Sequence, residues 1–299
     1  MILNKKIAVL FAAYNGERWI EEQLNSILCQ KDVLVDIYIS VDKSTDNTLD
    51  ICKKYALENR NVNVLPYGES FGGAGKNFYR LVKDCEFSSF DYIAFSDQDD
   101  IWHKDKLLNA IEKLQLYDCY SSNVTAFWED GREALIDKAQ PQQSWDYLFE
   151  AAGPGCTYVV KRELGLVFQE WLRRHHEVIA SKVSLHDWLI YAFARHNGYS
   201  WYIDPNPGMR YRQHQNNQVG TNNNLAAAKK RLRLINDKWY RHQVINIATI
   251  LGLEDSSVVK TGLINGYVGN LYLLININKL RRRVRDKLAL AVVLLLNIF

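Results

Sequence analysis

Cysteine is scarce in this chain, and the few cysteines lack the spacing that disulfides or zinc would need. The 299 residues include five cysteines, an odd number without a CxxC pair. This arrangement argues against a disulfide scaffold and against a zinc site, and it predicts a reducing compartment. The first residues also lack the long apolar core and small-residue cleavage site of a secretory signal. We therefore expect a cytoplasmic protein.

The chain has little net charge, +3, but this charge is unevenly distributed. From residue 225 onward, 13 lysines and arginines face four acidic residues, which gives +9 there and leaves the remainder acidic. Basic clusters lie at 229–233 and 279–287, and the second precedes an apolar stretch, 288–296, far shorter than the roughly 20 residues that span a bilayer. A basic cluster followed by a short apolar stretch predicts peripheral association with the inner face of the cell membrane. The alternative is an ordinary terminal helix packed on the body.

Apolar runs alternate with amphipathic segments through the first half of the chain. This order predicts an α/β fold, an open and mostly parallel sheet flanked by helices, followed by a basic helical C-terminal extension. We expect strands at 7–13, 35–41, 62–66, 92–96, 124–128, 156–161, 201–203 and 209–212. Helices are expected at 17–29, 46–59, 104–117, 145–150, 163–180 and 187–196, and a polar loop at 213–224.

Three carboxylates, Asp97, Asp99 and Asp100, follow the expected strand 92–96. Such a cluster repels itself unless a cation lies within it, and hard oxygen ligands favour Mg²⁺ or Mn²⁺. A divalent ion held in this way usually faces a diphosphate. Capping of the helix at 104–117 is the competing explanation, but capping needs one Asp rather than three. Tyr14 and Asp42 follow two other expected strands, so we expect these polar residues to converge at the carboxyl edge of the sheet.

Five segments lie in a recognisable order along the chain, at 11–17, 42–48, 95–102, 186–188 and 211–217. Together they resemble the inverting family-two glycosyltransferases of GT-A fold, most of all the bacterial rhamnosyltransferase-like branch that builds surface polysaccharides. The resemblance covers about residues 5–220. It implies a GT-A domain at 1–220, with a nucleotide-sugar half at about 1–130 and an acceptor half at about 131–220. Residues 221–299 would form the basic helical region.

The resemblance also implies roles for the residues of these segments. Asp97 would lie near the ribose, Asp99 would bind the metal, and Asp100 would support the site or touch the donor sugar. Many relatives have two acidic residues where this chain has Val41-Asp42, so a single carboxylate serves the base or ribose here. The other residues assigned to the nucleotide pocket are Ala12, Ala13, Tyr14, Glu17 and Asp42.

Further candidates come from the chemistry of glycosyl transfer, in which an acceptor hydroxyl needs a base and the leaving diphosphate needs positive charge. Asp187 fits the base, since it begins a partly apolar helix and matches the base position of the family; a helix cap is the alternative. His214 is a second metal-ligand candidate, or else a surface imidazole. Lys76 and Arg212 are candidate diphosphate contacts, or else solvated charges.

Two glycine-containing turns complete the expected site. The 72–77 loop is interpreted as a flexible wall of the nucleotide pocket with Asn77 as a contact, because it lacks the ending of a P-loop. The 153–157 turn would lie where donor sugar meets acceptor, or is a plain tight turn. The acceptor-binding candidates are Gly155, Cys156, His186 and Trp188.

These observations predict a metal-dependent inverting glycosyltransferase. L-rhamnose from a dTDP donor is the first expectation and a hexose from a UDP donor the second, with a lipid-linked saccharide as acceptor. A non-catalytic nucleotide-sugar or membrane-binding protein is the alternative from a different class. An aspartyl phosphotransferase is disfavoured because its acidic pair usually follows the first strand, and a nucleotidyltransferase because residues 11–18 are not a basic, Gly-rich loop. The sequence contains no nucleic-acid-binding motif.

Overall fold

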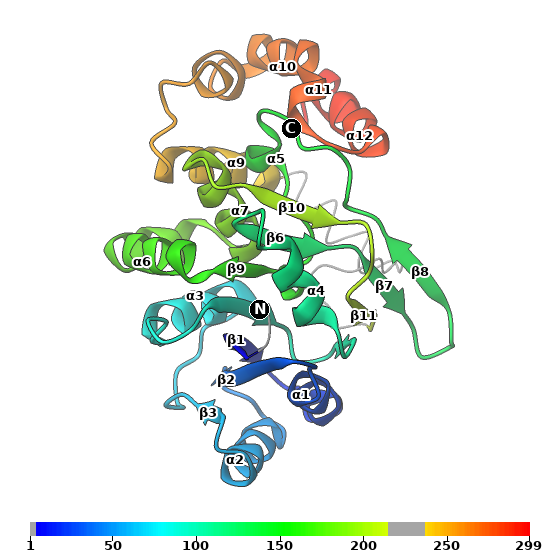
Figure 1. The fold of residues 1–299 in the computed structure, drawn as a ribbon. Helices are drawn as coiled ribbons and strands as arrows, with labels where there is room; N and C mark the ends of the chain where they lie inside the picture. Colours follow the sequence, from blue (N-terminus) through cyan, green and yellow to red (C-terminus); the bar gives the residue numbers. More distant parts are fainter. Residues whose placement is uncertain (1–3, 215–236) are drawn as a thin grey trace.

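A seven-stranded mixed sheet lies at the centre of the computed structural model, which describes residues 4–214 and 237–299 (Figure 1). The strand order is β10-β6-β9-β4-β1-β2-β3. Neighbours are parallel except β9, which is antiparallel to both β4 and β6. The strands are β1 (Lys5–Ala13), β2 (Val33–Val41), β3 (Val62–Val64), β4 (Tyr92–Ser96), β6 (Cys119–Ser122), β9 (Val159–Lys161) and β10 (Trp201–Asp204).

Helices cover both faces of this sheet, because the side chains of the central strands alternate between two apolar clusters. In β1, Ala8 and Leu10 face one cluster, while Ile7 and Val9 face the other. The first cluster is covered by α3 (Ala74–Asp84), α6 (Arg162–Lys182) and α7 (His186–His196). The second is covered by α1 (Ile20–Leu28), α2 (Thr48–Glu58) and α4 (Lys106–Lys113).

A second, four-stranded sheet has the order β5-β11-β7-β8. Strand β11 (Met209–Arg212) runs antiparallel to β5 (Ile101–Trp102) and parallel to β7 (Val124–Phe127), which pairs with β8 (Glu133–Ile136). Because β5 directly follows residues 97–100, its pairing with β11 brings a segment more than 100 residues distant against those carboxylates.

Most expected elements are confirmed, with shifts at their ends. The helix expected at 104–117 is shorter, and the strand expected at 156–161 begins as a 3-10 turn, η1 (Gly155–Thr157), before β9. Strands β5, β6 and β8 were not expected, and one expectation, the 72–77 loop, is wrong. Strand β6 was missed, because Ser121 and Ser122 interrupt its apolar pattern although both are fully buried. In the expected 72–77 loop only Gly72 and Gly73, which have positive φ angles, precede the helix. Helix α3 begins directly after them, at residue 74.

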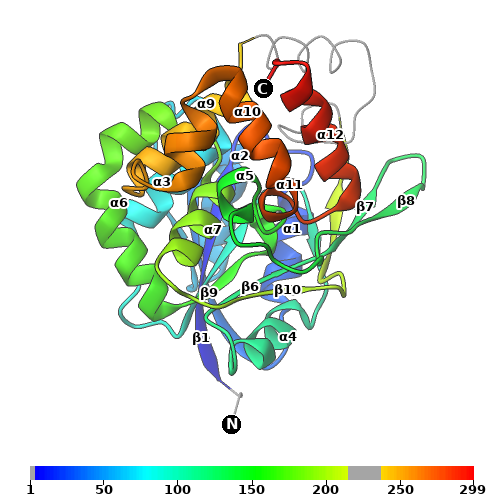
Figure 2. The same ribbon diagram turned by 90° about the horizontal axis from the view of Figure 1, so that it is seen from above.

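The C-terminal helices form one end of the molecule, and Figure 2 shows them from outside. They are α9 (Trp239–Ile250), the π-helical segment η2 (Val258–Leu263), α10 (Gly266–Ile275), α11 (Ile277–Leu280) and α12 (Val284–Leu295), and they pack against α5 (Asp146–Phe149). Their buried residues, among them Val244, Ile247 and Leu294, belong to the same apolar cluster as α3 and α7. No helix of the described residues has the length and hydrophobicity required to span a bilayer.

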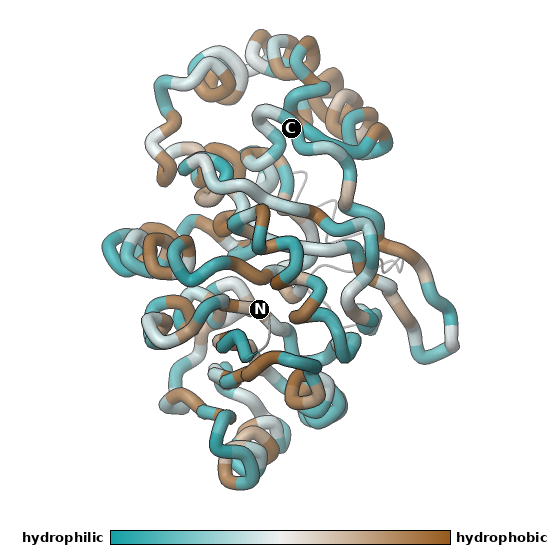
Figure 3. The backbone as a smooth tube through the Cα atoms, in the orientation of Figure 1, coloured by the Kyte–Doolittle hydropathy of each residue, from teal (hydrophilic) through white to brown (hydrophobic). Residues whose placement is uncertain are grey.

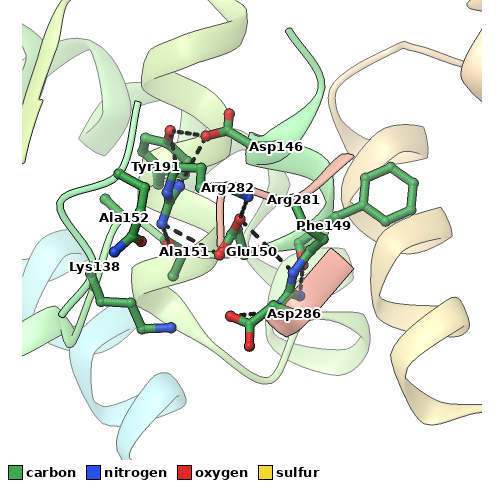
Figure 4. A network of polar contacts seen from close by, with 12 residues as sticks. Lys138, Asp146, Phe149, Glu150, Ala151, Ala152, Tyr191, Arg281, Arg282 and Asp286 are labelled. Atoms are coloured by element: carbon green, nitrogen blue, oxygen red, sulfur yellow. Dashed lines mark hydrogen bonds and ion pairs between the residues drawn. The ribbon is translucent and has the colours of Figure 1, made fainter. Parts of the chain in front are cut away.

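Part of the expected tail lies outside the described residues. This concerns the 220/221 domain boundary, most of the 213–224 loop and the basic cluster at 229–233, which stay predictions. The second basic cluster is described, and it differs from a uniformly solvated patch. Arg282 is buried, with Nη1 at 3.0 Å from Asp146 Oδ2 and Nη2 at 3.5 Å from Glu150 Oε2 (Figure 4). Arg281 lies within 3.5 Å of Asp286 and donates to the carbonyl of Phe149. The cluster therefore contributes internal ion pairs as well as surface charge.

Candidate active site

Gln98 joins the acidic loop, residues 97–100, to the end of β1. Its side-chain amide accepts a hydrogen bond from the Tyr14 N–H and donates one to the Tyr14 carbonyl, both at 2.7 Å. A Cβ added at Gly16 would lie 2.2 Å from Gln98 Oε1, so glycine is required for this approach. Ala12 and Ala13 are buried in β1, while Tyr14 is 53% exposed. Of these expected pocket residues, Tyr14 is therefore the one whose side chain is available to a ligand.

Glu17 and Asp42 are both engaged with backbone amides. Glu17 Oε2 accepts hydrogen bonds at 2.9 Å from the N–H and the side-chain amide of Asn47, just before α2. Asp42, at the end of β2, accepts hydrogen bonds from the N–H groups of Phe71 (2.9 Å) and Gly72 (3.2 Å). In this structure the Asp42 carboxylate thus holds the 71–72 segment over the end of the sheet.

The acidic loop gathers charges that destabilise one another. Burial raises the pKa of Asp97 to about 7, and the carboxylates of Asp99 and Asp187 add to the rise. Burial, Asp99 and Asp97 likewise raise the pKa of Asp100 well above its ordinary value. Asp100 accepts a hydrogen bond at 3.1 Å from the N–H of Arg212, but its second oxygen has no partner among the described residues. A cation among these groups would restore Asp97 and Asp100 to the ionised form.

The residues present fit a hard divalent ion. Asp99 Oδ2 lies 2.6 Å from Nε2 of His214, so the two metal-ligand candidates are adjacent. Ligand atoms of Asp97, Asp100 and Cys156 also lie within 4.8 Å of one another. Burial raises the pKa of the Cys156 thiol, which therefore stays protonated and is a poor ligand for a hard ion. Carboxylate oxygens with an imidazole suit Mn²⁺ or Mg²⁺.

The cationic candidates occupy different places. Arg212 bridges the site, since its Nε donates to the Asp99 carbonyl at 2.8 Å and its Nη2 pairs with Glu22. Lys76 is exposed in the first turn of α3. Asn77 is buried and donates to the carbonyl of Ser40 at 3.0 Å, so it links α3 to β2 rather than lining a surface.

Asp187 lies at the start of α7, facing the acidic loop. Burial raises the pKa of Asp187 to about 6. The hydrogen bond from the Trp188 N–H (2.8 Å) and the positive charge of Lys138 both oppose this rise. A carboxyl with this pKa is ionised at neutral pH and is more basic than an exposed Asp. A Cβ at Gly155 would lie 3.0 Å from the Asp187 Cβ, so the 153–157 turn passes directly over this residue.

The other acceptor candidates are largely internal. His186 is 8% exposed and stacks on Phe78 with ring centroids 3.9 Å apart, and burial lowers its pKa to about 3, so the ring is neutral. Trp188 donates from its indole N–H to the Tyr147 carbonyl at 3.0 Å. Cys156 is fully buried. These three shape the wall behind Asp187, and their role in acceptor binding stays a prediction.

Sequence reasoning missed two residues beside the acidic loop. Trp19 stacks on His214 with ring centroids 4.2 Å apart. Lys106 is fully buried, 3.6 Å from the Trp102 ring, and burial lowers its pKa to about 7. The burial of Lys106 could have been predicted, because helical periodicity places it on the same face of α4 as Ala110. No comparable signal exists for Trp19, whose partner is almost 200 residues away.

The site therefore combines two chemical capacities at one edge of the sheet. Carboxylates that favour a divalent cation lie on the β4 side, and a basic carboxylate lies opposite them on α7. This pairing suits displacement of a diphosphate by a hydroxyl nucleophile.

Comparisons with known proteins agree with this geometry. Residues 8–156 match the family model described as "Glycosyl transferase family 2". The chain is 54% identical over 291 residues to the dTDP-rhamnosyl transferase RfbG of Shigella flexneri, covering 96% of this chain and 100% of that protein. It is 32% identical over 114 residues to the putative teichuronic acid biosynthesis glycosyltransferase TuaG of Bacillus subtilis, covering 38% and 43%.

Solved structures share the fold at low identity. TarS of Staphylococcus aureus (residues 1–349) aligns with a TM-score of 0.55 at 16% identity, over 98% of this chain and 88% of that one. The mannosyltransferase PcManGT of Pyrobaculum calidifontis, a complex with GDP-Man and Mn²⁺, aligns with a TM-score of 0.54 at 16% identity, over 99% and 81%. The sheet, the acidic loop and the near full-length likeness to a rhamnosyl transferase lead to one conclusion: this chain belongs to glycosyl transferase family 2 and is a glycosyltransferase of GT-A fold.

Proposed function

We propose that this glycosyltransferase transfers L-rhamnose, with inversion, from dTDP-rhamnose to a lipid-linked saccharide in cell-surface polysaccharide synthesis. The 54% identity to RfbG along nearly the whole chain supports the donor most directly. At that identity the residues around the donor sugar are expected to be largely shared. The disposition of Asp187 opposite the acidic loop supports the single-displacement chemistry.

On the donor side, Tyr14 would contact the nucleotide, with Ala12, Ala13 and Asp42 shaping the pocket behind it. Asp99 and His214 would hold Mn²⁺ or Mg²⁺, with Asp97 and Asp100 close by. The ion, when bound, would offset the charge that develops on the leaving diphosphate. Arg212 already links the acidic loop to Glu22 of α1 at this point and would add positive charge there.

On the acceptor side, Asp187 would take the proton from the attacking hydroxyl. The hydroxyl oxygen forms its bond to the anomeric carbon as the bond from that carbon to the diphosphate oxygen breaks. The electron pair leaves with the nucleoside diphosphate, so configuration inverts. The buried wall of His186 and Trp188 would keep Asp187 dry and basic.

A donor panel tests the proposal. With Mn²⁺ present, dTDP-rhamnose should raise the melting temperature more than UDP-glucose or UDP-galactose, and should be hydrolysed slowly without an acceptor. Stronger stabilisation and turnover with a UDP-hexose would transfer the assignment to a hexosyltransferase.

We further propose that the α10–α12 end of the molecule lies on the inner face of the cell membrane. Apolar side chains point outward from both helices, including Ile275 (84% exposed) on α10 and Leu288 (64%) on α12. Figure 3 shows hydrophobic stretches recurring along this end. Lys279 and Arg285 are exposed beside them and would attract anionic headgroups.

Vesicle flotation tests this surface. The protein should float with vesicles containing phosphatidylglycerol, and Leu288→Glu should reduce the floated fraction severalfold. Leu57→Glu is the matched control, because Leu57 is also exposed but lies on α2. Equal loss in both variants, or flotation of neither variant nor wild type, contradicts the proposed surface.

A further inference from the structure

Lys138 lies near the expected catalytic base, and a hydrogen bond holds its backbone in place. Its N–H donates to Oδ1 of the buried Asn123 at 2.6 Å. Its side chain passes over Gly153, where an added Cβ would lie 3.8 Å from the Lys138 Cβ. The ammonium is near enough to Asp187 to oppose the burial that raises the pKa of that carboxyl. Lys138 therefore belongs to the acceptor side of the site.

The Lys138 ammonium makes no hydrogen bond or ion pair within the described part of the chain, and Figure 4 shows its end without a marked contact. The side chain is half-buried, and burial lowers its pKa while the Glu150 carboxylate opposes this. A partly desolvated ammonium without a partner is unfavourable, so its natural complement is an anion brought by a ligand.

The neighbouring carboxylates are already offset by arginines. Asp146 pairs with Arg195 and Arg282, and Glu150 lies near Arg281 and Arg282. Because the arginines already neutralise these two carboxylates, neither is left to neutralise the Lys138 ammonium.

Asp286, the remaining carboxylate of this group, is surrounded by positive charge. Burial works against its ionisation, yet its pKa is lowered by Arg281, Lys138, Arg285 and Arg283. The region between Lys138 and the start of α12 is thus positive overall, which favours an incoming anion.

The position of this charge matches the order of groups in one class of substrate. Lys138 lies against the 153–157 turn, which also contacts Asp187, and its charge acts on Asp286 in the first turn of α12, the helix that continues into the proposed membrane surface. We propose that Lys138 binds the phosphate that joins a lipid-linked acceptor to its isoprenoid chain. The saccharide would then reach Asp187, and the lipid chain would extend along α12. This inference rests on the proposed function and names the contact that its acceptor makes.

Binding of farnesyl phosphate in EDTA, measured by titration calorimetry, tests the contact without donor, metal or turnover. Wild type should bind farnesyl phosphate more tightly than farnesol or inorganic phosphate alone. Lys138→Met should weaken farnesyl phosphate binding about tenfold or more, the worth of a charge-assisted contact, and leave farnesol binding unchanged. Lys161→Met is the matched control, because Lys161 is also half-buried but pairs with Asp118 away from the site.

Two results would overturn the inference: equal farnesyl phosphate affinity in Lys138→Met and wild type, or wild-type affinity no greater for farnesyl phosphate than for farnesol. Lys138→Gln provides the same comparison if the methionine variant does not fold. Binding of dTDP-rhamnose with Mn²⁺ is measured in parallel. If wild type does not bind dTDP-rhamnose, the proposed function is refuted. If it binds dTDP-rhamnose but does not bind farnesyl phosphate, only the Lys138 contact is refuted.

Discussion

Replacement of Asp187 by Asn should remove turnover while the protein becomes more stable. The amide keeps the shape of the carboxylate and cannot accept the proton of the acceptor hydroxyl. Loss of a general base lowers kcat by about 10²- to 10⁴-fold. Affinity for dTDP and Mn²⁺ should remain, since the metal-ligand candidates lie on the opposite side of the site. In wild type, kcat/KM should fall about tenfold per pH unit below pH 6, because the pKa of Asp187 is about 6.

The stability change follows from the same pKa. Burial raises it from 3.8 to about 6, so the folded state binds the proton more tightly than the unfolded state does. Folding stability therefore decreases as pH rises from about 4 to about 6, and the full loss is present above that window. Two pKa units correspond to about 3 kcal/mol at most. Asp187→Asn should recover part of this, visible as a melting temperature several degrees higher at pH 8 and little changed at pH 4.

Asp105→Asn provides the control, because Asp105 also lies at the start of a helix, α4, but is exposed. That variant should show neither effect. Near-native turnover of Asp187→Asn, or a melting temperature unchanged at pH 8, would refute the assignment of a buried base.

Three further changes test other parts of the site. Asp99→Ala should abolish metal-dependent donor hydrolysis and the thermal shift produced by Mn²⁺; persistence of both would place the metal elsewhere. Gly16→Ala should displace the Gln98 side chain, whose Oε1 would lie 2.2 Å from the new methyl carbon, and weaken dTDP binding about tenfold, with Gln98→Ala giving a similar loss in the same titration. Arg282→Met should lower the free energy of unfolding by about 3–5 kcal/mol, because it leaves buried carboxylates short of a partner. Arg285→Met, at an exposed arginine, should change it by less than about 0.5 kcal/mol in the same urea titration.

The alternation of strands and helices up to β4 and the position of the acidic loop could largely be predicted from the sequence, because both depend on local pattern. Residues 92–95 are apolar and every residue of β4 is buried, as a central strand requires. The convergence of Tyr14 with the acidic loop follows from the rule that parallel strands end at one edge. That Gln98 makes this link was not predicted, because an amide contact depends on loop geometry rather than residue spacing.

The C-terminal region shows what local pattern cannot reveal. A run of arginines at 281–283 suggests a solvated basic patch, yet the side-chain partners of Arg282 lie 91–136 residues earlier in the chain. Such pairing depends on how helices pack, and no periodicity reports it. The apolar stretch 288–296 was equally ambiguous, since Leu290 and Leu294 face the core while Leu288 and Val292 face outward.

Two elements of the site come into backbone contact at Gly75. A Cβ there would lie 2.2 Å from the Ser184 carbonyl oxygen, so main chain touches main chain where α3 meets the segment leading into α7. No side chain separates α3 from the segment that leads into α7 at this point. A methyl group at this position would therefore push α3 away from the backbone that leads to Asp187, which makes Gly75 a spacing residue for the helix that carries the expected base.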